Sequence, residues 1–210
     1  SIRRRQRQMC IRDRYYEYKK DYIKAFGLYL NGNQIKANVL RFKPYARQND
    51  IKSIIQIFKK DFISKTYDYF GSSYLKRGQG CIFIVGMPRT GTTLLESILC
   101  SSDEIQTAGE RDYLSNLGEK IIESNHTPSF DDLDNIGKEY MRLIKPFNPD
   151  DKYKFIIDKM PSNIYNVGLI KSCLPAAKII CLDRNPSDNA WSVFTPVSYT
   201  HLRAHETRIH

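Results

Sequence analysis

The segment from residue 81 to residue 99, CIFIVGMPRTGTTLLESIL, has the residue types and spacing of a phosphate-binding loop. Gly86 and Gly91 are separated like the two glycines of the pattern G-x-x-x-x-G-K-[ST], but Thr92 stands where that pattern has lysine. Arg89 lies inside the loop instead. A strand that turns through glycines into a helix presents backbone N–H groups and the positive end of a helix dipole to an anion. The segment therefore predicts an anion site at which an arginine supplies the charge.

The nature of the expected anion follows from the missing lysine. That lysine reaches the β- and γ-phosphates in P-loop kinases and GTPases, so its absence argues against them and favours a donor with one phosphate at this point. Arg89 offers a planar guanidinium suited to a phosphate, and the loop amides and threonine hydroxyls can donate to it. The alternative is an ordinary glycine turn between a strand and a helix. The residues expected to bind the phosphate are Arg89, Thr90, Gly91, Thr92 and Thr93.

A second candidate anion site lies in LDRNPSDNAWSVF, residues 182–194. Arg184 closes an expected strand, Asn185-Pro186 makes a turn, and Asp188 stands at the start of the next helix. Ser192 follows Arg184 by eight residues. A strand-end arginine and a first-turn hydroxyl would meet at another helix N-terminus, where an anion is favoured. The alternative role for Arg184 is a surface salt bridge. Two such sites predict a ligand with two phosphates.

The elements that must position these residues alternate between strands and helices. Short apolar runs predict buried strands at 81–85, 154–158 and 178–183, and apolar periodicity predicts helices at 15–31, 51–70, 92–99, 130–144, 163–174 and from 185 onward. Such alternation is typical of βαβ units around a parallel sheet. The fold class expected is α/β, with a short helical segment before it.

Several helix ends carry recognisable signals. Asn31-Gly32 is a stop signal for the first helix, while Asp50 and Gly71 could cap the two ends of the second. Ser129 and Asp132 have the spacing of a capping box before the helix at 130–144. Residues 71–80, GSSYLKRGQG, are expected to form a linker between the helical segment and the first strand.

Both anion motifs resemble those of one enzyme family. GMPRTGTTLLESIL is similar to the 5′-phosphosulfate loop of sulfotransferases that use 3′-phosphoadenosine 5′-phosphosulfate (PAPS), and LDRNPSDNAWSVF is similar to their 3′-phosphate motif, with Arg184 and Ser192 at the matching positions. The resemblance covers roughly residues 20–194. It implies a P-loop-like three-layer α/β fold, PAPS as the sulfuryl donor, adenosine 3′,5′-bisphosphate as the product, and transfer to a hydroxyl or amine.

The same resemblance assigns roles to two further residues. The chain is most similar to the branch that includes tyrosylprotein sulfotransferases and bacterial tetratricopeptide-linked sulfotransferases, and KAFGLYLNGNQIK looks like the segment that follows the repeats. In this branch a lysine in a K-x-P setting contacts the donor, which implies Lys159, and a glutamate in a G-E segment is the base, which implies Glu110. The alternatives are a solvated lysine at a strand end and a glutamate that pairs with Arg111 or a nearby lysine. His126 lies in a polar segment with nothing to recommend it as a base.

The two ends of the chain look foreign to the protein. The codons of Met9–Asp13 can be the reverse complement of those of Val197–His201, which resembles a translated transposase adaptor from sequencing. The formal net charge is +10, of which residues 1–14 contribute +5 and residues 195–210 contribute +1, leaving an unremarkable +4. Nucleic-acid binding is therefore not expected. The expected domains are an artefactual tail at 1–14, a helical segment at 15–78, a C-terminally truncated sulfotransferase domain at 79–194, and a second tail at 195–210.

Rival functions remain open at this stage. No metal site is expected, but Asp158 and Asp183 end strands and keep a P-loop nucleotide kinase as an alternative. A non-catalytic interaction module is the other. The acceptor could be a peptide tyrosine, a carbohydrate or a small molecule. The chain has no apolar run long enough to span a membrane, and its five cysteines form no C-x-x-C pair, so a reduced, cytoplasmic location is expected.

Overall fold

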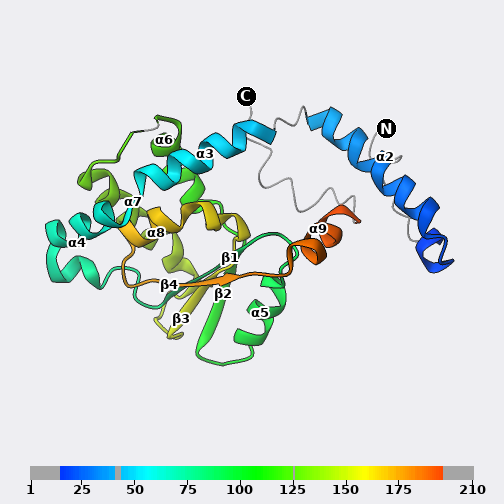
Figure 1. Cartoon of the computed structure of the whole chain (residues 1–210). Coiled ribbons are helices and arrows are strands. Elements are labelled where there is room, and N and C mark those ends of the chain that lie inside the picture. Colours follow the sequence, from blue (N-terminus) through cyan, green and yellow to red (C-terminus); the bar gives the residue numbers. More distant parts are fainter. Residues whose placement is uncertain (1–14, 41–43, 125, 196–210) are drawn as a thin grey trace. The chain divides into compact units, whose positions relative to one another are not determined.

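A computed structural model describes residues 15–40, 44–124 and 126–195 of the chain. The chain divides into two compact units, one formed by Ser1–Pro44 with Arg184–His210 and the other by Tyr45–Asp183. The elements are labelled in Figure 1. The adaptor-like segments within residues 1–14 and 196–210 lie outside the described residues.

The larger unit is built on a four-stranded parallel sheet. The strands are β1 (Cys81–Gly86), β2 (Ile105–Gly109), β3 (Phe155–Asp158) and β4 (Lys178–Leu182), in the order β2-β3-β1-β4. All six residues of β1 are buried, as a central parallel strand covered on both faces requires. The three expected strands are confirmed. β2 was not predicted, and its residues are mostly only half-buried.

Helices cover both faces of this sheet. Ile82, Ile84 and Ile157 pack on one face with apolar residues of α5 (Thr92–Leu99), and Phe83 and Val85 belong to the larger core on the other. That core also includes residues of α6 (Tyr113–Ser124), α7 (Phe130–Ile144) and α8 (Val167–Cys173). In Figure 1, α5 accordingly lies across the sheet from α7 and α8. The predicted three-layer α/β fold is confirmed.

Local signals set the ends of several of these helices. The capping box at Ser129 is confirmed: its hydroxyl oxygen accepts from the backbone N–H of Asp132 at 3.1 Å, and the Asp132 carboxylate accepts from the Ser129 N–H at 3.2 Å. The helix expected at 163–174 is a 3₁₀ segment, Pro161–Asn166, followed by α8. A second 3₁₀ segment, Lys145–Phe147, extends α7.

The single helix expected at 51–70 is wrong, because two helices occupy the region. They are α3 (Pro44–Ile57) and α4 (Lys60–Leu75). Asp50 lies inside α3 and cannot cap a helix start, and Lys59 adopts an extended conformation that begins α4. Gly71 does interrupt the helix, with a φ of +72°. The helical turn that follows it replaces the first half of the expected linker.

The smaller unit contains α2 (Tyr22–Leu40) and α9 (Pro186–Phe194). The predicted helix at 15–31 is wrong at both ends: residues 15–18 form one separate turn, and α2 continues through Asn31-Gly32 to Leu40. Contacts with α9 explain the continuation. The Asn33 side chain donates to the carbonyls of Tyr29 and Phe194, each at 2.9 Å, and Tyr29 packs edge-on against Trp191.

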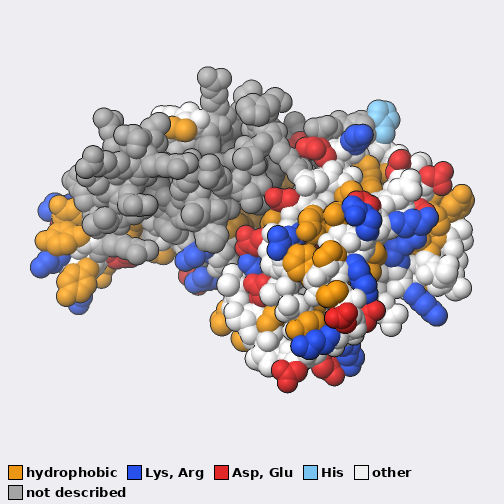
Figure 2. Space-filling view, turned by 180° about the vertical axis from the view of Figure 1, so that it is seen from behind, with side chains coloured by type: hydrophobic (Ala, Val, Ile, Leu, Met, Phe, Trp, Pro, Cys, Tyr) orange, Lys and Arg blue, Asp and Glu red, His pale blue; other side chains and the backbone are white. Residues whose placement is uncertain are grey.

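The visible surface carries mixed charge. Figure 2 shows Lys and Arg side chains interspersed with Asp and Glu over the described part of one face, with no large area of a single sign there. Among the described residues, no helix is both long and apolar enough to cross a membrane.

Candidate functional site

The loop between β1 and α5 has a backbone that its residue types permit. Gly86 has a φ of +151°, and a Cβ atom there would lie 2.6 Å from the carbonyl oxygen of Leu182 on the neighbouring strand. Gly91 caps α5 in the left-handed conformation, with a φ of +102°. Both glycines are therefore required by geometry. Arg89 also has a left-handed φ, +72°, which is uncommon for a residue with a side chain and is typical of functional loops.

This loop delivers the N-terminus of α5 to the carboxyl edge of the sheet. The backbone N–H of Leu95 bonds to the carbonyl of Gly91 at 3.0 Å, which leaves the amides of the preceding turn without intrahelical acceptors. The Arg89 and Thr93 side chains are exposed, whereas Thr92 is buried. The Thr90 hydroxyl donates to the carbonyl of Met87 at 2.8 Å and closes the turn. The arrangement can bind an anion through backbone amides and an arginine.

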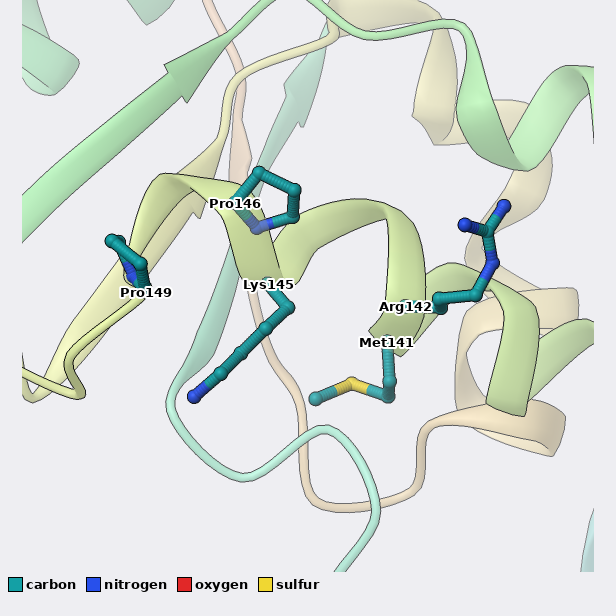
Figure 3. Close-up of a pocket in the computed structure, with 5 residues that line it drawn as sticks. All are labelled: Met141, Arg142, Lys145, Pro146 and Pro149. Carbon is teal, nitrogen blue, oxygen red and sulfur yellow. The ribbon is translucent and has the colours of Figure 1, made fainter.

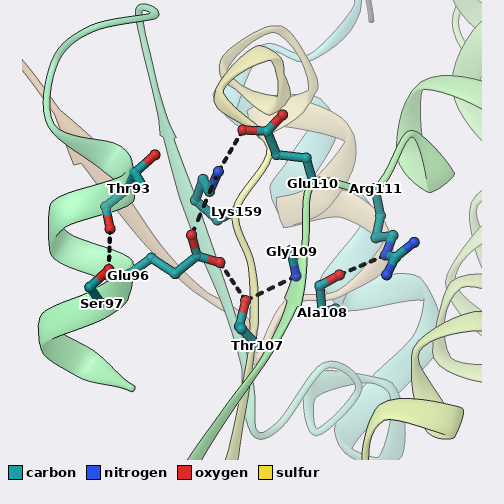
Figure 4. A network of polar contacts seen from close by, with 9 residues as sticks. All are labelled: Thr93, Glu96, Ser97, Thr107, Ala108, Gly109, Glu110, Arg111 and Lys159. Atoms are coloured by element: carbon teal, nitrogen blue, oxygen red, sulfur yellow. Dashed lines mark hydrogen bonds and ion pairs between the residues drawn. The ribbon is translucent and has the colours of Figure 1, made fainter. Parts of the chain in front are cut away.

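Lys159 lies at the same edge of the sheet, because it directly follows β3 and β3 pairs with β1. Its side chain is 8% exposed, and its ammonium lies between two carboxylates. The Nζ atom is 2.5 Å from Oε1 of Glu110 and 3.6 Å from Oε2 of Glu96 (Figure 4). The structure thus brings together Lys159 and Glu110, which are 49 residues apart in sequence. The alternative of a solvated lysine at a strand end is wrong, because the side chain is buried and paired with two carboxylates.

Glu96 is a member of this cluster that the sequence did not reveal. It lies on α5, one turn after Thr92, and its Oε1 atom accepts from the hydroxyl of Thr107 at 2.5 Å. The same hydroxyl oxygen accepts from the backbone N–H of Gly109 at 2.9 Å. The chain Gly109–Thr107–Glu96 fixes the carboxylate that faces Lys159 (Figure 4). The signal that could have identified Glu96 is its charge, because it is an acidic residue among the apolar residues of a short helix.

β3 ends at Asp158, a buried acid that directly precedes Lys159. Asp158 is 2% exposed, and its Oδ2 accepts from the hydroxyl of Tyr140 at 2.9 Å. Burial raises the pKa of Asp158 to about 7, although the Tyr140 hydrogen bond and the charge of Arg111 oppose the rise. Its Oδ1 atom has no hydrogen-bond partner among the described residues. Asp158 therefore serves the core, and its carboxylate is turned away from solvent.

Arg184 and Ser192 belong to the smaller unit. Arg184 is exposed just after β4, and Asn185 caps α9 with its side-chain oxygen, which accepts from the N–H groups of Ser187 at 3.0 Å and Asp188 at 3.3 Å. Ser192 is partly buried in the second turn of α9, so the expected first-turn hydroxyl is wrong in position. Helix geometry places the seventh residue of a helix beyond the first turn.

A separate pocket of about 600 Å³ lies at the end of α7 and the 3₁₀ segment that follows it. Figure 3 shows its lining, and none of the residues predicted from the sequence to form the site is part of it. The lining comprises Met141, Arg142, Lys145, Pro146 and Pro149. The described residues include no group of three or more His, Cys, Asp or Glu side chains placed to hold a metal ion.

Two comparisons with known proteins bear on this site. The model of the sulfotransferase family matches residues 81–209, which begin with β1 and include the loop, Lys159 and α9. An uncharacterized protein of Aquifex aeolicus (strain VF5) is 30% identical over 195 residues, an alignment that covers 84% of this chain and 24% of that protein. The chain thus spans about a quarter of the length of the relative that it matches.

Proposed function

The chain belongs to the sulfotransferase family, and we propose that it transfers a sulfuryl group from PAPS to a hydroxyl or amine acceptor. The observation that carries this proposal is the position of Lys159. A buried ammonium stands at the carboxyl edge of the sheet, beside the helix whose N-terminus is offered to an anion. Open α/β sheets bind their ligands at this edge.

The residues of the loop fit the 5′ end of such a donor. The 5′-phosphate would be held mainly by backbone amides of the loop residues Arg89, Thr90, Gly91, Thr92 and Thr93. The Thr92 side chain is buried, and Gly86 leaves no room for a side chain near the end of the strand, so few side chains can reach the phosphate. The lack of a lysine in the loop suits a single phosphate at this point. Arg184 and Ser192 would hold the 3′-phosphate, which distinguishes the donor from ADP and ATP.

Lys159 and Glu110 would carry the chemistry of transfer. When bound, PAPS supplies a sulfuryl group on a phosphate leaving group. The ammonium of Lys159 would stabilise the negative charge that grows on the departing phosphate oxygen. The carboxylate of Glu110, 41% exposed, is accessible to an acceptor and would take its proton.

The domain boundaries are also part of the proposal. We propose a catalytic domain at 79–194 after a helical segment at 15–78, with the sequences at 1–14 and 195–210 derived from an adaptor. The resemblance to tyrosylprotein and tetratricopeptide-linked sulfotransferases is compatible with a peptide tyrosine, a carbohydrate or a small-molecule hydroxyl as the acceptor.

A transfer assay tests the function directly. The chain would be incubated with ³⁵S-labelled PAPS and one of three acceptor classes: a tyrosine peptide, a chito-oligosaccharide and 4-nitrophenol. We expect label in one class, reduced roughly 100-fold or more in Lys159→Ala because a transition-state contact is lost.

Lys154→Ala is the matched control, since Lys154 is an exposed lysine at the opposite end of the same strand. Transfer unaffected by Lys159→Ala would contradict the assigned role. Phosphate transfer from labelled ATP with Mg²⁺, in place of sulfuryl transfer, would favour the kinase alternative.

A further inference from the structure

The lysine and the base assigned above are bonded to each other. The Nζ atom of Lys159 donates to Oε1 of Glu110 at 2.5 Å. This bond engages one of the two carboxylate oxygens of Glu110 and one of the three N–H donors of the ammonium. The pairing therefore competes with both proposed roles, since the same two groups must act on the acceptor and on the donor.

The two carboxylates around Lys159 differ in how firmly they are held. Glu96 is 13% exposed and bonded to Thr107, whereas the described contacts of the more exposed Glu110 contain only its bond to Lys159. Glu96 lies 3.6 Å from the ammonium, which allows attraction without a direct hydrogen bond. Glu110 is therefore the carboxylate that can leave, and Glu96 is the one that stays.

We propose that the Lys159–Glu110 ion pair is a donor-operated latch, in which anion binding at the loop takes the ammonium from Glu110 and so frees the base. This proposal rests on the proposed function. Glu96 is a positioning residue: it keeps Lys159 at the edge of the sheet during the exchange and spares the chain an unpaired buried charge. The latch implies an order, with the donor bound before the acceptor can be deprotonated.

The latch makes a counterintuitive prediction about affinity. A donor that must displace Glu110 from Lys159 loses part of its binding free energy to that displacement. Glu110→Gln keeps the size of the side chain and removes its charge, and Lys159 retains Glu96 as a partner. We expect this variant to bind adenosine 3′,5′-bisphosphate and PAPS roughly tenfold more tightly than the unmodified chain.

Isothermal titration of the 210-residue chain with each nucleotide measures this effect. Glu104→Gln is the matched control, because it removes one carboxylate charge at the amino edge of the same sheet, where Glu104 makes an exposed pair with Lys154 at 3.5 Å. We expect Glu104→Gln to leave the affinity within about twofold, because exposed charges are screened over such a span. A thermal melt of each variant checks that it folds.

A double-mutant cycle separates the latch from a general charge effect. In a Lys159→Ala background, Glu110→Gln should no longer tighten binding, because nothing remains to be released. Equal tightening in both backgrounds, equal tightening by Glu104→Gln, or no tightening at all overturns the latch. Failure of the unmodified chain to bind either nucleotide overturns the proposed function and the latch with it, whereas binding without tightening overturns the latch alone.

Discussion

The two anion sites proposed for the donor are built from different parts of the polypeptide. The loop after β1 depends on backbone shape: Gly86 and Gly91 have positive φ values, and the binding groups are mostly amides at the start of α5. The segment after β4 depends on side chains: Arg184 is exposed, and the amides at the start of α9 are already bonded to the side chain of Asn185. The first site is shaped by packing within the larger unit, and the second depends on exposed side chains of the smaller unit.

This difference predicts which changes should disturb folding and which should disturb recognition. A substitution at the first site should disturb the sheet, because Gly86 lies against the carbonyl of Leu182 at the end of β4. A substitution at the second site should chiefly change how the ligand is recognised.

The largest effect is expected for Gly86→Ala. The new Cβ atom would lie 2.6 Å from the carbonyl oxygen of Leu182 and require a φ that alanine rarely adopts. Overpacking and backbone strain together should cost about 3–5 kcal/mol of unfolding free energy. Urea unfolding followed by circular dichroism measures the change.

Gly71→Ala is the matched comparison for this substitution. Gly71 also has a positive φ, +72°, but a Cβ atom there would meet nothing within 4 Å. Only the backbone strain, about 1–3 kcal/mol, should appear. Equal costs at the two glycines would show that the contact with β4 does not constrain the loop.

A smaller effect, dependent on pH, is expected at Asp158. Because burial raises the pKa of the folded carboxyl from 3.8 to about 7, the folded state keeps a proton between these values that the unfolded state has lost. The stability that this group contributes is therefore present below about pH 4 and falls as pH rises towards 7, by up to about 4 kcal/mol. Urea unfolding at a series of pH values should show this decline in the unmodified chain and a shallower one in Asp158→Asn. Parallel curves would contradict the buried, protonated acid.

Much of the fold could be predicted from local patterns. The continuous apolar runs of β1, β3 and β4 and the capping box at Ser129 gave elements that the structure confirms. The pattern failed where tertiary contacts override a local signal. α2 continues through Asn31-Gly32 because Asn33 bonds to α9. β2 was missed because its residues, IQTAG, are mostly half-buried and form no continuous apolar run.

The candidate site could be predicted only in part, because tertiary contacts also determine which of its residues meet. The loop could be predicted because positions that leave no room for a Cβ atom require glycine, and the spacing of those glycines can be recognised in the sequence. The roles of Lys159 and Glu110 were inferred from the family resemblance. Local sequence patterns could not show that the two residues lie close together, because residues 49 apart meet only through the pairing of β2 with β3. Glu96 and Thr107 escaped notice because neither belongs to a motif, and their meeting depends on how α5 packs on the sheet.

The sharpest effect on recognition is expected for Arg184→Ala, which removes the guanidinium proposed to bind the 3′-phosphate. Thermal melts of the chain would be recorded alone, with adenosine 3′,5′-bisphosphate and with ADP. At about a hundred times its Kd the bisphosphate should add roughly 2.7 kcal/mol, and ADP should add less. Compared with its own melt without ligand, Arg184→Ala should lose the advantage of the bisphosphate over ADP. Equal stabilisation by the two nucleotides in the unmodified chain, or an advantage that survives Arg184→Ala, would contradict a donor recognised by its 3′-phosphate.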